Sequence, residues 1–169
     1  MQLSASNPLS AWVNLGADAG QRAATRAAKL PERGLAALVL IDSHPSRGVD
    51  WLYRRLGITQ SGTVRLLDRL QSLDLITRAR PAGQREVEIT ITAAGRSVLA
   101  DGVDARARAL EELVSPLGER EREQLIGLIV KALSGQRRER RSADALCRLC
   151  AWPACGDDCP VDASVNDPG

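Results

Sequence analysis

The sequence predicts a mainly α-helical protein that carries one β-hairpin. Apolar residues recur at helical spacing over most of the 169 residues, and the period changes to two in two short runs between residues 76 and 91. A Pro-Ala-Gly tip separates the two runs, as in a hairpin turn. The length allows one compact domain with an appendage. Because 44% of the residues are hydrophobic but only 2% are aromatic, aliphatic side chains must fill the core.

Four helices are predicted ahead of the hairpin, over residues 8–30, 35–43, 49–56 and 61–73. Pro31 closes the first helix, and the dense apolar run of the second favours a buried helix. Gly57 follows the third helix at the position of a left-handed cap. The residues expected to form the buried face of the fourth helix are Val64, Leu67, Leu70 and Leu73.

Beyond the fourth helix we expect strands at residues 76–80 and 87–91, and helices between Thr92 and Pro116 and between Gly118 and Gly135. Thr92 is the expected cap of the first of these helices. The residues that follow Gly135 begin with QRRERRS, a charged linker or helix extension. From Cys147 onward the chain has no repeat period and is rich in Asp, Pro and Gly.

Positive charge is concentrated in the middle of the chain. The net charge of +2 argues against a basic protein that coats nucleic acid everywhere, but all positive residues except Lys29 and Lys131 are Arg. Residues 44–85 contain eight Arg against three Asp. Because the planar guanidinium donates two parallel hydrogen bonds, Arg suits phosphates and base edges. This local excess of charge favours a nucleic-acid partner.

The order helix, helix, Gly turn, helix and hairpin is the winged helix-turn-helix arrangement, with long helices on either side. In this arrangement the second helix of the pair enters the major groove, and the hairpin, or wing, reaches the minor groove or the phosphates. The expected DNA-facing residues are Thr59, Gln60, Ser61, Thr63, Arg65 and Arg69 on that helix and Arg80, Gln84 and Arg85 on the wing. The alternative interpretation is that these are solvated polar faces around a small core.

Residues 35–95 resemble the MarR family of bacterial transcription factors. The similarity is carried mainly by LYRRLGITQSGTVRLLDRLQSLDLITR and by EITITAAG after the wing, and it extends over residues 8–135. The wing of that family usually carries an Asp two residues before an Arg; this chain has Arg85, but Gly83 stands at the Asp position. By this resemblance, Arg85 is the minor-groove contact.

The resemblance implies a homodimer that binds a palindromic operator in double-stranded DNA and usually represses nearby genes. It also implies a small-molecule effector, because family members bind small aromatic acids. The end helices carry more apolar surface than a winged domain of this size can cover, which independently favours pairing with a second copy. The expected organisation is an N-terminal dimerisation helix at 1–33, the winged domain at 34–92, C-terminal dimerisation helices at 93–135, and a linker with a cysteine-rich metal-binding tail at 136–169.

All four cysteines lie in this tail, as Cys147, Cys150, Cys155 and Cys159, with the spacing C-x2-C-x4-C-x3-C. Four clustered thiols in a reducing compartment favour a metal centre over disulfides. Zinc and iron-sulfur clusters both accept four sulfur ligands, so the spacing leaves the two open. Metal-free redox thiols and incidental cysteines are the remaining alternatives. A redox-active cluster would make the protein a sensor, whereas zinc would be structural.

No catalytic motif is present. The chain has one histidine, His44, which we interpret as a local polar or capping residue, and it has no Gly-rich phosphate loop, H-E-x-x-H or G-x-S-x-G sequence. We therefore predict that the protein is not an enzyme. We also predict a cytoplasmic protein without membrane segments, because no apolar run approaches about 20 residues. The alternative function is a metal-carrying interaction module whose winged domain binds another protein.

Overall fold

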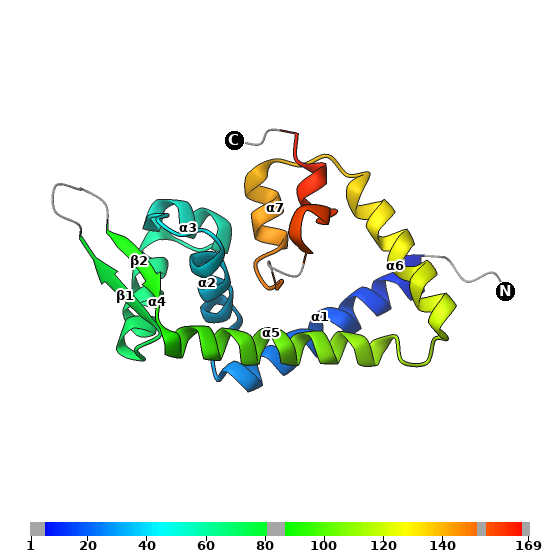
Figure 1. The fold of residues 1–169 in the computed structure, drawn as a ribbon, viewed down its shortest axis with the longest axis horizontal. Helices are drawn as coiled ribbons and strands as arrows, with labels where there is room; N and C mark the ends of the chain where they lie inside the picture. The colour runs from blue at the N-terminus through cyan, green and yellow to red at the C-terminus, as the bar shows by residue number, and fades with distance from the viewer. Residues whose placement is uncertain (1–5, 81–86, 152–154, 167–169) are drawn as a thin grey trace.

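A computed structural model describes residues 6–80, 87–151 and 155–166, and it is mainly helical with a small two-stranded antiparallel sheet (Figure 1). The predicted fold class is confirmed. The elements in chain order are α1 (Ser6–Ala28), α2 (Glu32–Ser43), α3 (Val49–Leu56), α4 (Gln60–Ser72), β1 (Ile76–Ala79), β2 (Glu88–Ile91), α5 (Ala93–Leu113), α6 (Glu119–Ser134) and α7 (Arg140–Leu146). Short 3-10 turns follow at Gly156–Asp158 and Asp162–Ser164.

Helix α2 forms the centre of the winged domain. Every residue from Gly34 to Ile41 is buried, because α1, α3, α5 and β2 all pack against this one helix. The uniform apolar run of the sequence thus reflects a helix that is covered on all sides. The predicted buried helix is confirmed, and His44 caps its C-terminal end by donating its backbone N–H to Leu40 O.

The buried face of α4 differs from the one predicted. Val64 and Leu73 are 40% and 39% exposed, whereas Thr63, Leu67 and Leu70 are buried. A repeat of three residues drifts around a helix that has 3.6 residues per turn, so the four predicted positions do not share one face. Thr63, Leu67 and Leu70 are separated by four and then three positions, which keeps them on one face of the helix.

The hairpin is tied to the winged domain through its buried isoleucines. Ile76 pairs with Ile91 in the antiparallel register, and Ile89 is also buried. Thr92 caps α5 as predicted, since its hydroxyl accepts a hydrogen bond of 2.9 Å from the backbone N–H of Gly95. The predicted Pro-Ala-Gly tip lies outside the described residues.

Helices α1 and α5 pack against one another along the base of the molecule, and α6 turns back above them at the end remote from the hairpin (Figure 1). None of the described residues of α6 is buried, although the helix carries several large apolar side chains. The exposed apolar side chains of α1 and α6 are Leu9, Trp12, Val13, Leu15, Ile126, Leu128 and Val130. Within the described parts of the chain, no helix is long and apolar enough to span a membrane.

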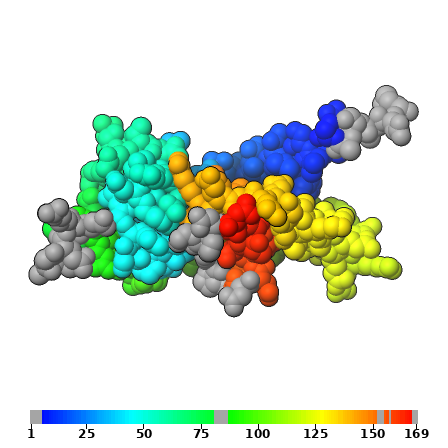
Figure 2. All heavy atoms as spheres, turned by 90° about the horizontal axis from the view of Figure 1, so that it is seen from above, coloured from blue at the N-terminus to red at the C-terminus, as the bar shows by residue number. Residues whose placement is uncertain are grey.

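The segment after α6 folds back onto the winged domain. Figure 2 shows its atoms, in orange and red, between the cyan surface of the winged domain and the yellow α6. Helix α7 packs against α3, and Leu149 is buried in the main hydrophobic core. The tail is therefore part of the folded body and does not extend into solvent.

Candidate nucleic-acid interface and cysteine cluster

The N-terminus of α4 is well defined by local geometry. Gly57 ends α3 with φ of 64°, a left-handed conformation that glycine adopts without a steric penalty. Thr59 then caps α4, because its hydroxyl accepts a hydrogen bond of 3.1 Å from the backbone N–H of Gly62. Gln60 is exposed and donates to Asp50 Oδ1 at 3.0 Å. Thr59, Gln60 and Ser61 therefore stand exposed at the start of the helix, as predicted.

Three predicted arginines are exposed and have no ionic partner among the described residues. Arg65 and Arg69 are exposed on α4, and Arg80 is exposed just beyond β1. Arg78 differs, because its guanidinium donates at 2.5 Å to both Asp68 Oδ1 and Gln71 Oε1. The arginines available for an anionic partner are consequently fewer than the local composition indicates.

Thr63 does not belong to this surface. Its side chain is completely buried, and its hydroxyl donates to the carbonyl of Thr59 at 3.2 Å. The prediction that Thr63 faces DNA is wrong, because it occupies the core-facing position of α4 in place of Val64. Gln84 and Arg85, the other predicted wing contacts, lie outside the described residues, as does Gly83.

Arg55, one of the eight central arginines, faces the tail. Its Nε lies 2.5 Å from Asp144 Oδ2 of α7, its guanidinium carbon lies 3.9 Å from the ring centre of Trp51, and both charged side chains are largely buried. His44 Nε2 is 4.0 Å from Asp144 Oδ1, and its ring centre is 4.7 Å from that of Trp51. Burial lowers the pKa of His44 below 6.5, while the Asp144 charge acts in the opposite direction. The sequence gives no local sign that Asp144 joins this site.

The four cysteines converge on one small cavity. Cys147, Cys150, Cys155 and Cys159 line a space of about 40 Å³ together with Gly156 and Asp162. The thiol of Cys147 is in hydrogen-bonding contact with those of Cys150 and Cys159, and Cys155 contacts Cys159 in the same way. All four are free thiols. The sequence prediction that they form one cluster agrees with this arrangement.

The thiols of the cluster differ in proton affinity. The hydrogen bond from Cys147, together with the charges of Arg106 and Arg148, lowers the pKa of Cys150 to about 7 against the opposing effect of burial. The same hydrogen bond, together with burial, raises the pKa of Cys147. Burial also raises the pKa of Cys155. Cys150, which is exposed at the surface, is therefore the most readily ionised of these three thiols.

Contacts within the tail close the chain around the cluster. Arg138 pairs with Val165 in a parallel β-bridge and donates to Ser164 Oγ at 2.5 Å, while Arg140 forms an ion pair with Asp162. In the described part of the chain, no three His, Cys, Asp or Glu side chains are arranged to hold a metal ion. Of the apolar residues close to the cysteines in sequence, Leu149 and Val161 are buried and Leu146 is exposed.

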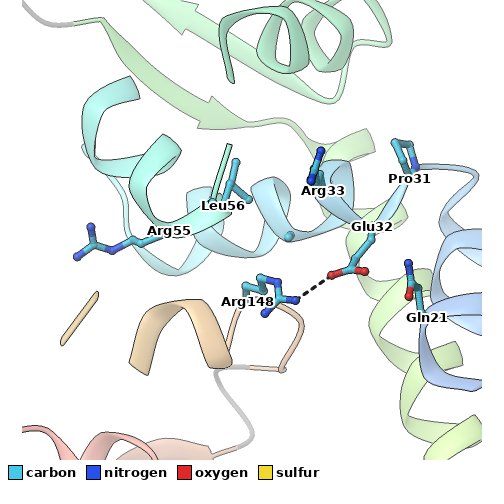
Figure 3. Close-up of a pocket in the computed structure, with 9 residues that line it drawn as sticks. Gln21, Pro31, Glu32, Arg33, Arg55, Leu56 and Arg148 are labelled. Carbon is cyan, nitrogen blue, oxygen red and sulfur yellow. Dashed lines mark hydrogen bonds and ion pairs between the residues drawn. The ribbon is translucent and has the colours of Figure 1, made fainter. Parts of the chain in front are cut away.

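A second contact joins the tail to the other side of α2. Arg148 donates to Glu32 Oε1 at 3.0 Å, and both residues line a cavity of about 580 Å³ with Gln21 of α1 and Leu56 of α3 (Figure 3). Figure 3 shows Arg148 reaching Glu32 from the tail while Arg55 points away from both. The tail is thus held by two separate ion pairs, one with Arg55 of α3 and one with Glu32 of α2.

An apolar groove lies at the opposite end of the molecule, between α1, α5 and α6. It has a volume of about 470 Å³, and its lining includes Trp12, Gly16, Leu110, Leu125 and Ile129. A further cavity of about 790 Å³ lies beside α4 and is lined by Arg33, Arg65 and Leu66, among others; it shares Arg33 and Gly57 with the cavity around Arg148. This second cavity places two arginines next to the exposed surface of α4.

No protein-family model and no curated protein sequence matches this chain. Solved structures do resemble it. Rv1404 from Mycobacterium tuberculosis has a TM-score of 0.67 at 22% identity, over 80% of this chain and 96% of that protein. A MepR mutant from S. aureus bound to an oligodeoxyribonucleotide has a TM-score of 0.63 at 20% identity, over 79% and 98%. The MarR-family protein Rv2887 from M. tuberculosis, in complex with salicylic acid, has a TM-score of 0.59 at 15% identity, over 78% and 97%.

These comparisons establish the fold. The chain shares the winged-helix architecture of MarR-family proteins along almost the whole length of each of them. Each match leaves roughly a fifth of this chain without a counterpart.

Proposed function

We propose that this protein is a homodimeric transcription regulator that reads double-stranded DNA with α4 and the wing. The observation that carries the proposal is that Thr59, Gln60, Ser61, Arg65 and Arg69 are all exposed at the start and along the length of α4, with Arg80 exposed just beyond β1. Guanidinium groups and the N–H groups of a helix N-terminus both favour phosphate and base acceptors. The MepR mutant with the same fold is bound to an oligodeoxyribonucleotide, which supports this use of the surface.

A second copy of the chain is the proposed occupant of the apolar groove. The large apolar side chains of α1 and α6 are exposed, and they continue from the groove between α1, α5 and α6. An isologous dimer formed through these helices would bury this surface on both copies at once. Two α4 helices related by a twofold axis would read a palindromic operator in successive major grooves.

We further propose that the regulator acts as a repressor and responds to a small anionic effector. The Rv2887 complex contains salicylic acid, a small aromatic carboxylate. In this chain, Arg33 and Arg65 line the cavity beside α4, where a carboxylate would meet positive charge close to the DNA-reading surface. Binding there would change DNA affinity only if the ligand favoured one arrangement of α4 over another.

The test is DNA binding by the full-length protein, measured by fluorescence anisotropy on duplexes from upstream of its own gene and on random duplexes. We expect tighter binding to a palindromic upstream sequence and a steep dependence on salt. Arg65→Ala should lose the specific binding, whereas Arg120→Ala, an exposed change on the remote α6, should retain it. Equal affinity for upstream and random duplexes would instead favour a winged domain that binds a protein partner.

A further inference from the structure

We propose that Cys147, Cys150, Cys155 and Cys159 bind one thiophilic metal ion of the zinc type, and that this ion locks residues 135–166 onto α3. The first part of the proposal is independent of DNA binding. The second part, in which the locked tail sets the position of α4, rests on the proposed function. Both parts follow from the position of the tail against α3 and from the contacts that hold it there.

The cavity between the four thiols is small, with a volume of about 40 Å³. A single tetrahedral ion with four thiolate ligands needs only the space between the sulfur atoms.

The chemistry of the lining also favours four sulfur ligands. Asp162 is the carboxylate that lines the cavity, and it is already paired with Arg140. The thiols contact one another, so binding requires them to turn toward the ion and release their remaining protons. As the described side chains stand, no three of them are arranged to hold an ion, so binding has to rearrange the thiols.

The tail needs a cross-link because its own core is very small. Its separate hydrophobic cluster contains Ala143, Cys147 and Val161 as buried members, with three partly buried neighbours. So little apolar surface does not offset the conformational entropy of about thirty ordered residues. An ion bound by Cys147 and Cys150 at the end of α7 and by Cys155 and Cys159 would close this segment, and its binding free energy would become folding free energy of the tail.

The closed tail contacts the element that positions α4. Besides the Asp144 to Arg55 ion pair, Arg141 Nε donates to the backbone carbonyl of Arg54 at 3.1 Å. Helix α3 ends at Gly57, and α4 begins at Gln60, so a shift of α3 is carried into α4 across a short turn. Loss of the ion would release α7 and with it these contacts on α3.

Metal content is the first measurement. Full-length protein purified with and without added zinc is assayed for zinc, iron and acid-labile sulfide, and the apoprotein is titrated with zinc against a chromogenic chelator. We expect one zinc per chain, with a dissociation constant on the order of 1 nM or tighter. Cys150→Ser and Cys155→Ser should weaken binding at least about 100-fold, whereas Asp158→Asn, an exposed change in the same loop, should not. Iron with stoichiometric sulfide, or no metal bound tighter than 1 μM, would overturn the single-ion assignment.

Hydrogen exchange then tests the coupling. We expect zinc to slow exchange of the amides of α7 and of α3 in the wild type, and to have no effect on them in Cys150→Ser, whose α2 and α5 should stay protected as in the wild type. Arg55→Gln should uncouple the two helices, so that zinc protects α7 but not α3, and Arg54→Gln is the matched control on the same helix. Protection of α7 without α3 in the wild type would refute the coupling. Protection of both helices in a protein that binds no DNA would refute the proposed function and leave the metal site standing.

Discussion

Asp144 of α7 holds Arg55 of α3 across 89 positions of sequence, with 2.5 Å between Oδ2 and Nε. The carboxylate is 1% exposed and the guanidinium 11%, and Arg55 also lies over the ring of Trp51. Because of this pair, Arg55 makes a structural contact and is not available to bind phosphate. The pair also makes the tail a part of the winged domain.

Replacing Asp144 with Asn should release the tail. Removing one partner of a buried ion pair leaves the other charge without compensation, at a cost of about 3–5 kcal/mol. That cost falls on the docking of α7, so the main core of the winged domain should remain folded. Limited proteolysis should cleave the chain near residues 135–140 in Asp144→Asn and not in the wild type.

A double-mutant cycle measures the interaction between Arg55 and Asp144 separately from the other contacts of the tail. Arg55→Met combined with Asp144→Leu removes both charges together, so the free energy of unfolding should fall by less than the two single changes predict. Additive losses, measured by denaturant titration, would mean that the two side chains contribute independently.

The Gly95 to Leu75 contact gives a second prediction. A Cβ atom at Gly95 would lie 2.1 Å from the carbonyl oxygen of Leu75 and 2.7 Å from Ile91 Cγ1. Gly95→Ala should therefore lower the free energy of unfolding by at least the roughly 1–3 kcal/mol that overpacking costs. Gly127→Ala on α6 has open space around it and should be neutral or stabilising by up to about 1 kcal/mol. Equal thermal midpoints for the two variants would contradict the close packing at Gly95.

The difference between Arg69 and Arg78 gives a third prediction, on DNA binding. Arg69 is exposed without an ionic partner among the described residues, whereas Arg78 is held by Asp68 and Gln71. Arg69→Ala should reduce the slope of log affinity against log salt concentration by about 0.9, the contribution of one phosphate contact. Arg78→Ala should change that slope much less. A matching loss for Arg78→Ala, measured by anisotropy at several salt concentrations, would show that Arg78 leaves Asp68 to bind phosphate.

Helix ends that are set by neighbouring residues were predictable from the sequence. Gly57, with its left-handed backbone, and Thr92, with its capping hydroxyl, end and begin helices where the sequence placed these events. The exposed residues at the start of α4 follow from the same logic, because caps and periodicity act within one turn of helix. The exposed face of α4 was therefore correct except at Thr63, which is buried, and at Val64, which is exposed.

The remaining features depend on contacts between distant segments. Thr63 is small enough to be buried with its hydroxyl bonded to the preceding turn, and residue type alone does not distinguish it from an exposed threonine. The docking of the tail on α3 depends on Asp144, whose partners are far away in sequence and supply no periodic pattern. The spacing of the cysteines predicted a cluster but not its position beside the winged domain.

His44 gives the last prediction, on the pH dependence of stability. Burial lowers its pKa in the folded protein, so below pH 6.5 the unfolded chain binds a proton that the folded chain does not. The free energy of unfolding should therefore fall as the pH drops below 6.5, and this contribution should level off once the pH is below the folded pKa. Because His44 is the one histidine of the chain, His44→Gln should remove this slope. Denaturant titrations between pH 5 and pH 8 test this variant, and an unchanged slope in His44→Gln would assign the pH dependence to other groups.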